Sequence, residues 1–539
     1  MILFFNSQPA KKDKQRLPVN PERKTQNRFV FYLEKCIGCH TCEVACAEQN
    51  ALPADTVWRR VGEIEGGIFP DIKRYFFSLS CNHCIDPSCM KGCPASAYHI
   101  NERGIVVHDD PNCIGCSYCT WNCPYGVPVF QKDRKIVTKC DMCSNRLDAG
   151  EKPACVAACP AGAIETEEVA LGEVIETYKA CGAAPGMPDP EISIPSTKIV
   201  IPEKMDQSLF FKTNKNIVKP EKPHYSLIFM TVFTQLSVGG LMLSFLADLL
   251  RVIIPIPIEV FRSVSYLAPV LFGIAGLSLA SSILHLGRPV LFFRAFLNIK
   301  TSWLSREALG FAGFSLLAFV YSALLFFSGN RIELPQIGMA LSDINDNTRL
   351  GVGIFTLLAG VYGVYASSRI YRVPSRPAWN QKKTTFDFFN VMILTGVPLF
   401  SHASSVSSFL QGNSVLLNEL VKGFSVFAMF FGLAITLIDF SALRYRKESE
   451  VEELNKSAYL YHSVFYRENT FRLLVLAVAS FLLLMSVNEY FPSGSISDTV
   501  LTLLALVMYI VYAFVTRYLF FVTVVPSNMP GNFIVEVNK

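Results

Sequence analysis

The chain is polar over its first 223 residues and predominantly apolar afterwards. From residue 224 on, long apolar runs alternate with short polar loops, and runs of about 18 or more mostly apolar residues are typical of transmembrane helices. A soluble helical core is a poor alternative, because a core helix rarely needs such a length eight times in a row. The pattern therefore predicts eight membrane spans, at about 226–250, 264–285, 308–328, 350–368, 386–404, 417–441, 471–488 and 498–521.

Composition supports a membrane protein. The 539 residues are 51% hydrophobic and only 17% charged, which is too apolar for an ordinary soluble protein. We expect membrane lipid, and no nucleic acid, among its partners. The pattern divides the chain into a basic N-terminal tail (1–27), a cysteine-rich domain (28–180), a proline-rich strap (181–223), a membrane domain (224–525) and a C-terminal tail (526–539).

The strap contains "APGMPDPEISIPS" and "KPEKP", and such sequence extends rather than folds. We expect it to lie along the cysteine-rich domain and to lead into the first span. The opening "MILFF" is too short for the apolar part of a signal peptide. Arg59 and Arg60 precede no apolar stretch, so we expect no export signal.

Sixteen of the 17 cysteines form four quartets, and only Cys181 is left over, more typical of a packed or free thiol than of a ligand. Disulfides between such close neighbours rarely meet the required geometry, and zinc sites usually use pairs of cysteines. The spacing C-x2-C-x2-C-x3-C of the first and third quartets is that of bacterial ferredoxins, and sixteen thiolates in four quartets predict four [4Fe–4S] clusters. The quartets are Cys36, Cys39, Cys42 and Cys46; Cys81, Cys84, Cys89 and Cys93; Cys113, Cys116, Cys119 and Cys123; and Cys140, Cys143, Cys155 and Cys159.

Ferredoxin runs work in pairs, because the fourth cysteine of one run ligates the cluster of the other. Spacing alone leaves two pairings open, the first quartet with the second or the first with the fourth. Four clusters in one domain form an electron relay, and no substrate-converting site is evident around them.

An even number of spans places both ends of the membrane domain on one face. The predicted loops of that face carry Arg288, Arg294, Lys300, Arg306, Arg369, Arg372, Arg376, Lys382, Lys383, Arg444, Arg446, Lys447, Lys456 and Arg467, whereas the opposite loops carry mainly Arg251, Arg262, Arg331 and Arg349. The positive-inside rule then predicts a cytoplasmic-membrane protein with its clusters on the cytoplasmic side. Alternatively, some of these charges contact the cysteine-rich domain.

A quinol is the expected electron source within the bilayer. A heme b needs two facing axial ligands, but His285 and His402 fall at opposite faces and His462 lies in a charged loop. We therefore expect no heme. Quinol oxidation releases protons, which requires a titratable or hydrogen-bonding group beside an apolar slot.

Residues 284–311 are the best candidate for this quinol site. His285 ends the second predicted span and Glu307 opens the third, with Arg288 and Arg306 beside them and Trp303 at the interface. A histidine and a carboxylate at this depth can accept the two protons. The alternative is that His285 reaches towards the interface and Glu307 caps its helix or pairs with Arg306.

Four further polar residues stand out in the apolar half of the chain. Asp248 and Asp439 lie near helix ends and are expected to be solvated, whereas Asn390 and His402 are minor candidates for a polar path.

The sequence resembles two subunits of dimethyl sulfoxide reductase-type molybdenum enzymes. The four quartets and "CPYGVPVF" (123–130) resemble the iron–sulfur subunit, and "IFMTVFTQLSVGG" (228–240), "HLGRP" (285–289) and "TSWLSRE" (301–307) resemble the membrane anchor. In that family these are separate chains, so residues 28–525 look like their fusion. The resemblance implies an α+β ferredoxin-like domain with four clusters, joined to an all-α bundle of about eight transmembrane helices.

The resemblance also implies ligands, substrate and partner. It pairs the first quartet with the fourth and the second with the third. It makes menaquinol the electron donor, assigns the functional pair to His285 and Glu307, carries no heme, and requires a separate molybdopterin (molybdenum or tungsten) catalytic subunit. The implied ligand sets are Cys36, Cys39, Cys42 and Cys159; Cys140, Cys143, Cys155 and Cys46; Cys81, Cys84, Cys89 and Cys123; and Cys113, Cys116, Cys119 and Cys93.

Three alternatives stay open. Electrons can run the other way, from a substrate-oxidising partner to quinone. The membrane domain can instead be an ion-translocating complex, although charged residues are scarce within its predicted spans. It can also be a tether without quinone chemistry. The substrate of the catalytic partner is not readable from this chain.

Overall fold

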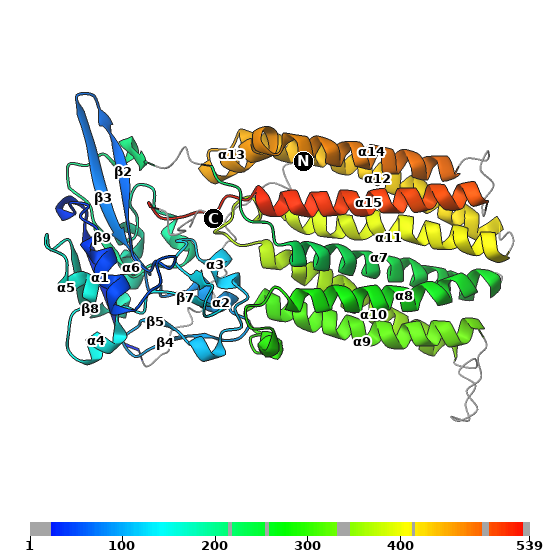
Figure 1. Ribbon diagram of the computed structural model, residues 1–539, viewed down its shortest axis with the longest axis horizontal. Coiled ribbons are helices and arrows are strands. Elements are labelled where there is room, and N and C mark those ends of the chain that lie inside the picture. Colours follow the sequence, from blue (N-terminus) through cyan, green and yellow to red (C-terminus); the bar gives the residue numbers. More distant parts are fainter. Residues whose placement is uncertain are drawn as a thin grey trace.

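The computed structural model describes residues 23–213, 218–253, 258–330, 345–411, 415–487 and 495–531. A strand-containing part, residues 25–212, lies at one end of a bundle of long helices, residues 225–522 (Figure 1). We call these two parts the cysteine domain and the membrane domain. Most of the predicted basic tail (residues 1–22), the end of the C-terminal tail (532–539) and Arg331 lie outside the described residues.

The central strand of the cysteine domain joins the two ends of its sequence. β1 (Thr25–Tyr32) pairs antiparallel with β8 (Ile164–Ala170) and parallel with β9 (Lys198–Val200). The apolar side chains of Phe29 and Phe31 are buried beneath this sheet. Because β1 precedes the first cysteine quartet and β8 follows the fourth, the pairing brings these two quartets together.

The remaining elements of the cysteine domain are short, apart from one long hairpin. β2 (Arg60–Ile68) and β3 (Asp71–Leu79) form this hairpin, and β10 (Phe210–Lys212) pairs with β2. The other elements are two small hairpins, β4 (Tyr98–Ile100) with β5 (Val106–His108) and β6 (Val129–Gln131) with β7 (Ile136–Thr138), and the helices α1 (Thr41–Gln49), α2 (Ser88–Gly92), α3 (Tyr118–Asn122), α4 (Ser144–Asp148), α5 (Ala154–Ala157) and α6 (Leu171–Cys181).

The predicted strap is more structured than its prolines suggest. Both β9 and β10 lie within residues 181–223 and add strands to two sheets. Ile199 of β9 is buried, so burial of an apolar side chain favours strand formation between the prolines. The folded cysteine domain therefore extends to Lys212 rather than ending at residue 180.

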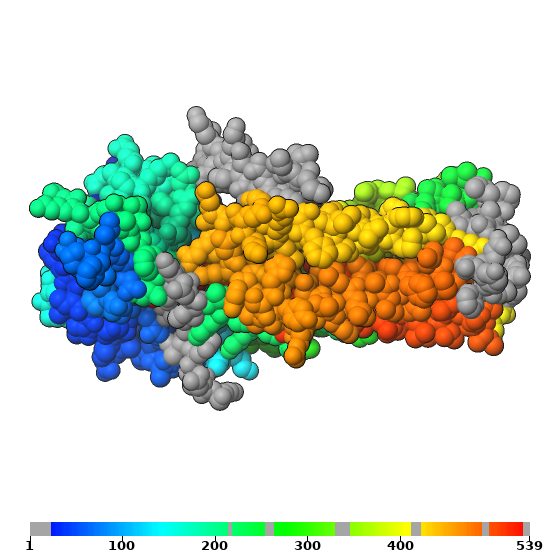
Figure 2. All heavy atoms as spheres, turned by 90° about the horizontal axis from the view of Figure 1, so that it is seen from above, coloured from blue at the N-terminus to red at the C-terminus, as the bar shows by residue number. Residues whose placement is uncertain are grey.

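Within the described residues, eight helices of the membrane domain are long and apolar enough to cross a bilayer, which confirms the predicted all-α bundle beside a cysteine domain of mixed helices and strands. α7 and α11 pack with their backbones in contact, because Gly239 and Gly396 lack the side chains that would separate them. α13 (Glu452–Tyr459) is a short helix beside the cysteine domain (Figures 1 and 2). The eight helices are α7 (Tyr225–Ile253), α8 (Ile258–Ile283), α9 (Trp303–Asn330), α10 (Asp346–Tyr371), α11 (Lys382–Gln411), α12 (Val415–Lys447), α14 (Tyr466–Val487) and α15 (Ile496–Val522).

The two domains interlock through side chains and the end of the described chain. Tyr118 and Trp121 of α3 are buried in the core of the membrane domain, and the Tyr118 hydroxyl donates a 3.0 Å hydrogen bond to the Ile370 carbonyl. Beyond α15 the chain runs back into the cysteine domain (Figure 1), where Met529 is buried. Lys212 donates a 2.6 Å hydrogen bond to the Asn528 carbonyl. Part of the predicted C-terminal tail is thus a packed strap between the domains.

Candidate functional site

The cysteines gather into four sets that mix the quartets. Helix α1 of the first quartet packs against α5 of the fourth, and α2 of the second packs against α3 of the third. Cys36, Cys39, Cys42 and Cys159 line one small cavity, and Cys81, Cys84, Cys89 and Cys123 line another. Cys46 lies within electrostatic range of Cys140, Cys143 and Cys155, as does Cys93 of Cys113, Cys116 and Cys119.

The surroundings of these thiols suit an anionic iron–sulfur cluster. No disulfide joins any cysteines in the described part of the chain. Backbone N–H groups donate to sulfur, as from Ala97 to Cys93 Sγ and from Ala163 to Cys159 Sγ, both at 3.3 Å. The donor set and its hydrogen bonds therefore fit four-iron clusters.

Two buried cations add to this fit. Arg59 and Lys139 are 2% and 3% exposed and lie among the cysteines. Burial lowers the pKa of Lys139, but the surrounding cysteine thiolates raise it by more. Positive charge at this depth balances the negative charge that thiolate-held clusters carry.

A mostly apolar cavity of about 410 Å³ lies where α3 meets the membrane domain. His285, Glu307 and Cys116 all line it, so the structure brings the two predicted quinol-site residues to one wall with a cluster cysteine. Its volume falls within the range of ligand pockets, roughly 300–1,000 Å³. The other lining residues are Tyr118, Trp121, Leu227, Met230, Leu279, Ala280, Ser282, Ile283, Leu286, Phe292, Ala295, Phe296, Leu304, Ala308, Phe311, Ala312, Ile370 and Tyr371.

His285 lies just beyond α8, in the loop that contacts the cysteine domain. Burial lowers the pKa of His285, and a hydrogen bond with the backbone of Cys116 opposes this effect. The next residues bind the same cysteine loop, since the Gly287 N–H donates to the Gly115 carbonyl at 3.2 Å and the Arg288 N–H donates to the Ile114 carbonyl at 3.1 Å. The histidine is thus fixed to the loop that carries Cys116.

A glycine is required at position 287 for the loop after α8 to lie this close to the cysteine domain. A Cβ atom at this position would lie 2.2 Å from the Lys135 carbonyl oxygen, closer than any normal contact. This explains the glycine in "HLGRP", because only a residue without a side chain lets the two backbones meet.

Glu307 lies in the first turns of α9, where it forms a hydrogen bond with Ser367 of α10. Protein atoms surround its carboxyl group, and part of its surface faces the cavity. No Glu307–Arg306 ion pair occurs within the described ranges, which argues against the alternative that the two residues pair. Arg306 instead stacks over Trp303 at 4.4 Å and donates to the carbonyls of Ile299 and Lys300.

The two predicted supporting arginines do not line the cavity. Arg288 donates a 3.0 Å hydrogen bond to the Asp110 carbonyl of the cysteine domain, so it docks the two domains. Arg294 does the same at the Pro111 carbonyl, at 2.6 Å. Some basic loop residues therefore contact the cysteine domain, as the alternative interpretation of the charge pattern allowed.

His224 is a site residue that the sequence analysis missed. It precedes α7, and its ring lies in edge-to-face contact with those of His285 and Trp121, at centroid distances of 5.2 and 5.3 Å. Burial, together with the neighbouring His285 and Arg376, lowers the pKa of His224 to about 4. The sequence feature that could have identified His224 is its position directly before the first apolar run.

The interpretation of Asp248 and Asp439 as solvated helix ends is wrong. Asp248 is fully buried and pairs with Arg349 of α10 at 2.8 Å. Asp439 is 8% exposed and pairs with Lys383 at 2.7 Å and Arg472 at 2.9 Å. Partners on other helices allow these carboxylates to be buried.

These buried ion pairs also remove the argument against an ion-translocating complex, which rested on the scarcity of charged residues within the spans.

The two minor candidates for a polar path, Asn390 and His402, lie apart from the cavity. Asn390 is buried, with no partner for its Oδ1 among the described residues. His402 contacts Thr502 Oγ1 at 3.2 Å and does not line the cavity.

Comparison with known proteins supports the assignment of both the cysteine domain and the membrane domain. Residues 72–169 match the family described as 4Fe-4S dicluster domain, and residues 220–523 match DMSO reductase anchor subunit (DmsC). The cysteine domain is similar to one chain of the anaerobic dimethyl sulfoxide reductase of Escherichia coli, with 42% identity over 26% of this chain and 73% of the relative. The corresponding protein of Haemophilus influenzae is 37% identical over 33% of this chain and 90% of the relative.

A third relative has a different name. It is a subunit of the sulfite dehydrogenase of Allochromatium vinosum, 37% identical over 26% of this chain and 67% of the relative. The DmsC match covers more than half of the 539 residues. The chain therefore belongs to the DMSO reductase anchor subunit family, and its membrane domain is fused to an iron–sulfur electron-transfer domain of the dimethyl sulfoxide reductase type.

Proposed function

We propose that the chain oxidises menaquinol in the 410 Å³ cavity and delivers the electrons, through four [4Fe–4S] clusters, to a separate molybdopterin catalytic subunit. The observation that carries this proposal is that His285, Glu307 and Cys116 line one apolar cavity. Proton acceptors and a cluster ligand thereby face the same space.

Oxidation of a quinol to a quinone removes two electrons and two protons. The imidazole of His285 and the carboxylate of Glu307 accept the protons, and the cavity's apolar side chains hold the ring and exclude water. His224, which does not line the cavity, packs against the ring of His285 and supports its position.

The proposed ligand sets follow the packing of α1 on α5 and of α2 on α3. When bound, the clusters supply one-electron carriers that take the two quinol electrons in turn. The sets are Cys36, Cys39, Cys42 and Cys159; Cys46, Cys140, Cys143 and Cys155; Cys81, Cys84, Cys89 and Cys123; and Cys93, Cys113, Cys116 and Cys119.

We place the catalytic subunit beside the first of these sets. Cys39 is exposed, as are the neighbouring apolar residues Ile37 and Val44, at 64% and 68%. Exposed apolar side chains grouped beside a redox centre suit a partner surface. We also propose that this end lies in the cytoplasm, because basic loop residues such as Arg369 and Arg372 flank Tyr371, which packs against Trp121 of the cysteine domain.

A second candidate function runs the same relay in reverse, from a substrate-oxidising partner to quinone. The observation in its favour is the similarity to a protein named as a subunit of a sulfite dehydrogenase. Two rapid-mixing experiments compare the directions. The complex with reduced clusters is mixed with menaquinone to measure the rate of quinone reduction, and the oxidised complex is mixed with menaquinol to measure the rate of quinol oxidation. Faster reduction of quinone than oxidation of quinol supports the reverse direction.

Metal content and quinone binding test the proposal. The complex purified in mild detergent should contain about sixteen irons from this chain itself, with any further iron from the partner, and about one molybdenum or tungsten with a co-purifying large subunit. Sixteen irons without either metal would reject the molybdopterin partner. A fluorescent quinone analogue should bind at about one per chain, and Glu307→Gln should weaken binding while Arg306→Gln, one residue away but outside the cavity, should not.

A further inference from the structure

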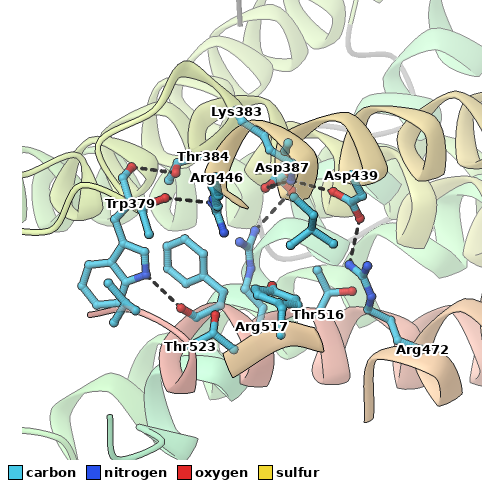
Figure 3. A pocket seen from close by; sticks show the side chains of 16 residues that line it. Trp379, Lys383, Thr384, Asp387, Asp439, Arg446, Arg472, Thr516, Arg517 and Thr523 are labelled. Carbon is cyan, nitrogen blue, oxygen red and sulfur yellow. Dashed lines mark hydrogen bonds and ion pairs between the residues drawn. The ribbon is translucent and has the colours of Figure 1, made fainter. Parts of the chain in front are cut away.

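A second, smaller cavity lies among α11, α12, α14 and α15 (Figure 3). Trp379 and Phe520 in its wall pack against Tyr371, which lines the quinol cavity. The volume of the smaller cavity is about 30 Å³, enough for one particle of about the size of a water molecule. Ionisable side chains from all four helices line it: Lys383, Asp387, Asp439, Arg446, Arg472 and Arg517.

The charges around this cavity do not cancel. Lys383 binds Asp387 at 2.6 Å and Asp439 at 2.7 Å, and Arg472 binds Asp439 at 2.9 Å. Arg517 is 1% exposed. Three buried cations against two carboxylates leave one positive charge, and Arg446 adds a second at the half-buried edge.

Arg517 is the unbalanced cation. Within the described ranges its Nη2 donates only to neutral acceptors, the Gln235 side chain at 3.0 Å and the Asp387 carbonyl at 3.4 Å, and its guanidinium lies 3.7 Å over the Phe388 ring. The Asp387 carboxylate lies within electrostatic range of Arg517 but is already bound by Lys383. Among the described residues, the Nε and Nη1 of Arg517 have no hydrogen-bond partner. The Nε of Arg472, in the same cavity wall, is also unpartnered within the part of the chain that the structure describes.

Unpaired guanidinium N–H groups this deep are costly unless an acceptor reaches them. A neutral water can accept hydrogen bonds but leaves the excess charge in place. A single monovalent anion can accept hydrogen bonds from these N–H groups and offset one of the excess positive charges, and the small volume of about 30 Å³ favours a halide-sized ion. We propose that this cavity binds one small monovalent anion, such as chloride, held mainly by Arg517.

The ion would add a contact between helices that already pack together and are linked by the Lys383 and Asp439 pairs. Its binding should therefore stabilise the second half of the membrane domain, and no step of quinol oxidation depends on it. This makes the proposal independent of the proposed function.

The first experiment measures binding of radioactive chloride to the purified complex at constant ionic strength, with gluconate as the replacing anion. We expect about one chloride per chain that unlabelled bromide displaces. Arg517→Gln should lose this binding, whereas Arg444→Gln, which removes an exposed arginine paired with Glu448, should keep it. Absence of retained chloride in the wild-type complex overturns the proposal, whatever the variants do.

Thermal unfolding supplies a second readout. Replacing gluconate by chloride should raise the Tm of the wild type by about 2 °C or more in a saturable manner, and should leave that of Arg517→Gln unchanged. If Arg517→Gln fails to fold, Arg517→Lys, which keeps the charge but loses the Nε and Nη1 donors, should bind chloride at least tenfold more weakly. Stabilisation by vesicles of anionic phospholipid but not by chloride would assign the site to a lipid phosphate and reject the small anion.

Discussion

Replacing Gly287 with alanine tests whether the loop after α8 holds His285 against the cysteine domain. The added Cβ would lie 2.2 Å from the Lys135 carbonyl oxygen, and real Cβ contacts are at least about 3.0 Å. Because the obstacle is backbone, the two loops must separate by about 0.8 Å. This movement separates His285 from the loop that carries Cys116.

The cost follows from the contacts that the separation strains. The hydrogen bonds Gly287 N–H to Gly115 carbonyl and Arg288 N–H to Ile114 carbonyl are already 3.2 and 3.1 Å long. Each contributes about 0.5–1.5 kcal/mol, so docking weakens by roughly 1–3 kcal/mol. A displacement near 1 Å at a reacting group costs up to about 10²-fold in rate. We therefore expect a roughly 10- to 100-fold slower transfer from quinol to the clusters.

The assay is anaerobic rapid mixing with menaquinol while cluster absorbance is recorded. Gly313→Ala is the matched control, because nothing lies within 4 Å of a Cβ at that position of α9. The control should transfer electrons at the wild-type rate. Equal rates in Gly287→Ala and Gly313→Ala, with both proteins folded and their iron complete, would refute the reasoning about this contact.

Three further predictions concern stability. Asp248→Asn leaves the buried Arg349 without its main partner and should lower the free energy of unfolding, measured by heat or denaturant, by about 3–5 kcal/mol. The control Asp346→Asn, at an exposed partner of the same arginine, should lower it by about 1 kcal/mol or less. Met529→Ala leaves a cavity in the core of the cysteine domain and should lower the free energy of unfolding by about 2–5 kcal/mol. The loss should appear as faster proteolysis of the cysteine domain. The pKa of His224 in the folded protein, about 4, lies below the ordinary value of 6.5, so the unfolded chain takes up the proton first. The free energy of unfolding should therefore fall as the pH drops from 6.5 to 4, by up to roughly 3 kcal/mol. His224→Phe should unfold with a smaller acid dependence, and an equal dependence would contradict burial of this ring.

The sequence predicts what depends on local spacing. The cysteine intervals indicate clusters because a cubane takes four thiolates from a short run, and the apolar lengths indicate eight spans because the bilayer fixes helix length. His285 and Glu307 could be selected because each stands where a polar group meets an apolar run.

Contacts between distant segments were not predictable in this way. The pairing of quartets depends on β1 meeting β8, which are more than 130 residues apart. Asp248 was assigned to solvent because its partner Arg349 lies 101 residues further along the chain. Met529 follows the last span, and neither its position nor its type indicates burial in the other domain.

The measurement that tests the central claim most directly is the reduction of the clusters by menaquinol, followed by electron paramagnetic resonance, in the wild type and in His285→Gln and Glu307→Gln. Dithionite should reduce the clusters fully in all three proteins, which shows that the relay is intact. Menaquinol should reduce them rapidly in the wild type and at least about 10²-fold more slowly in either variant. Reduction by menaquinol at the wild-type rate in both variants would contradict the assignment of the cavity as the site of quinol oxidation.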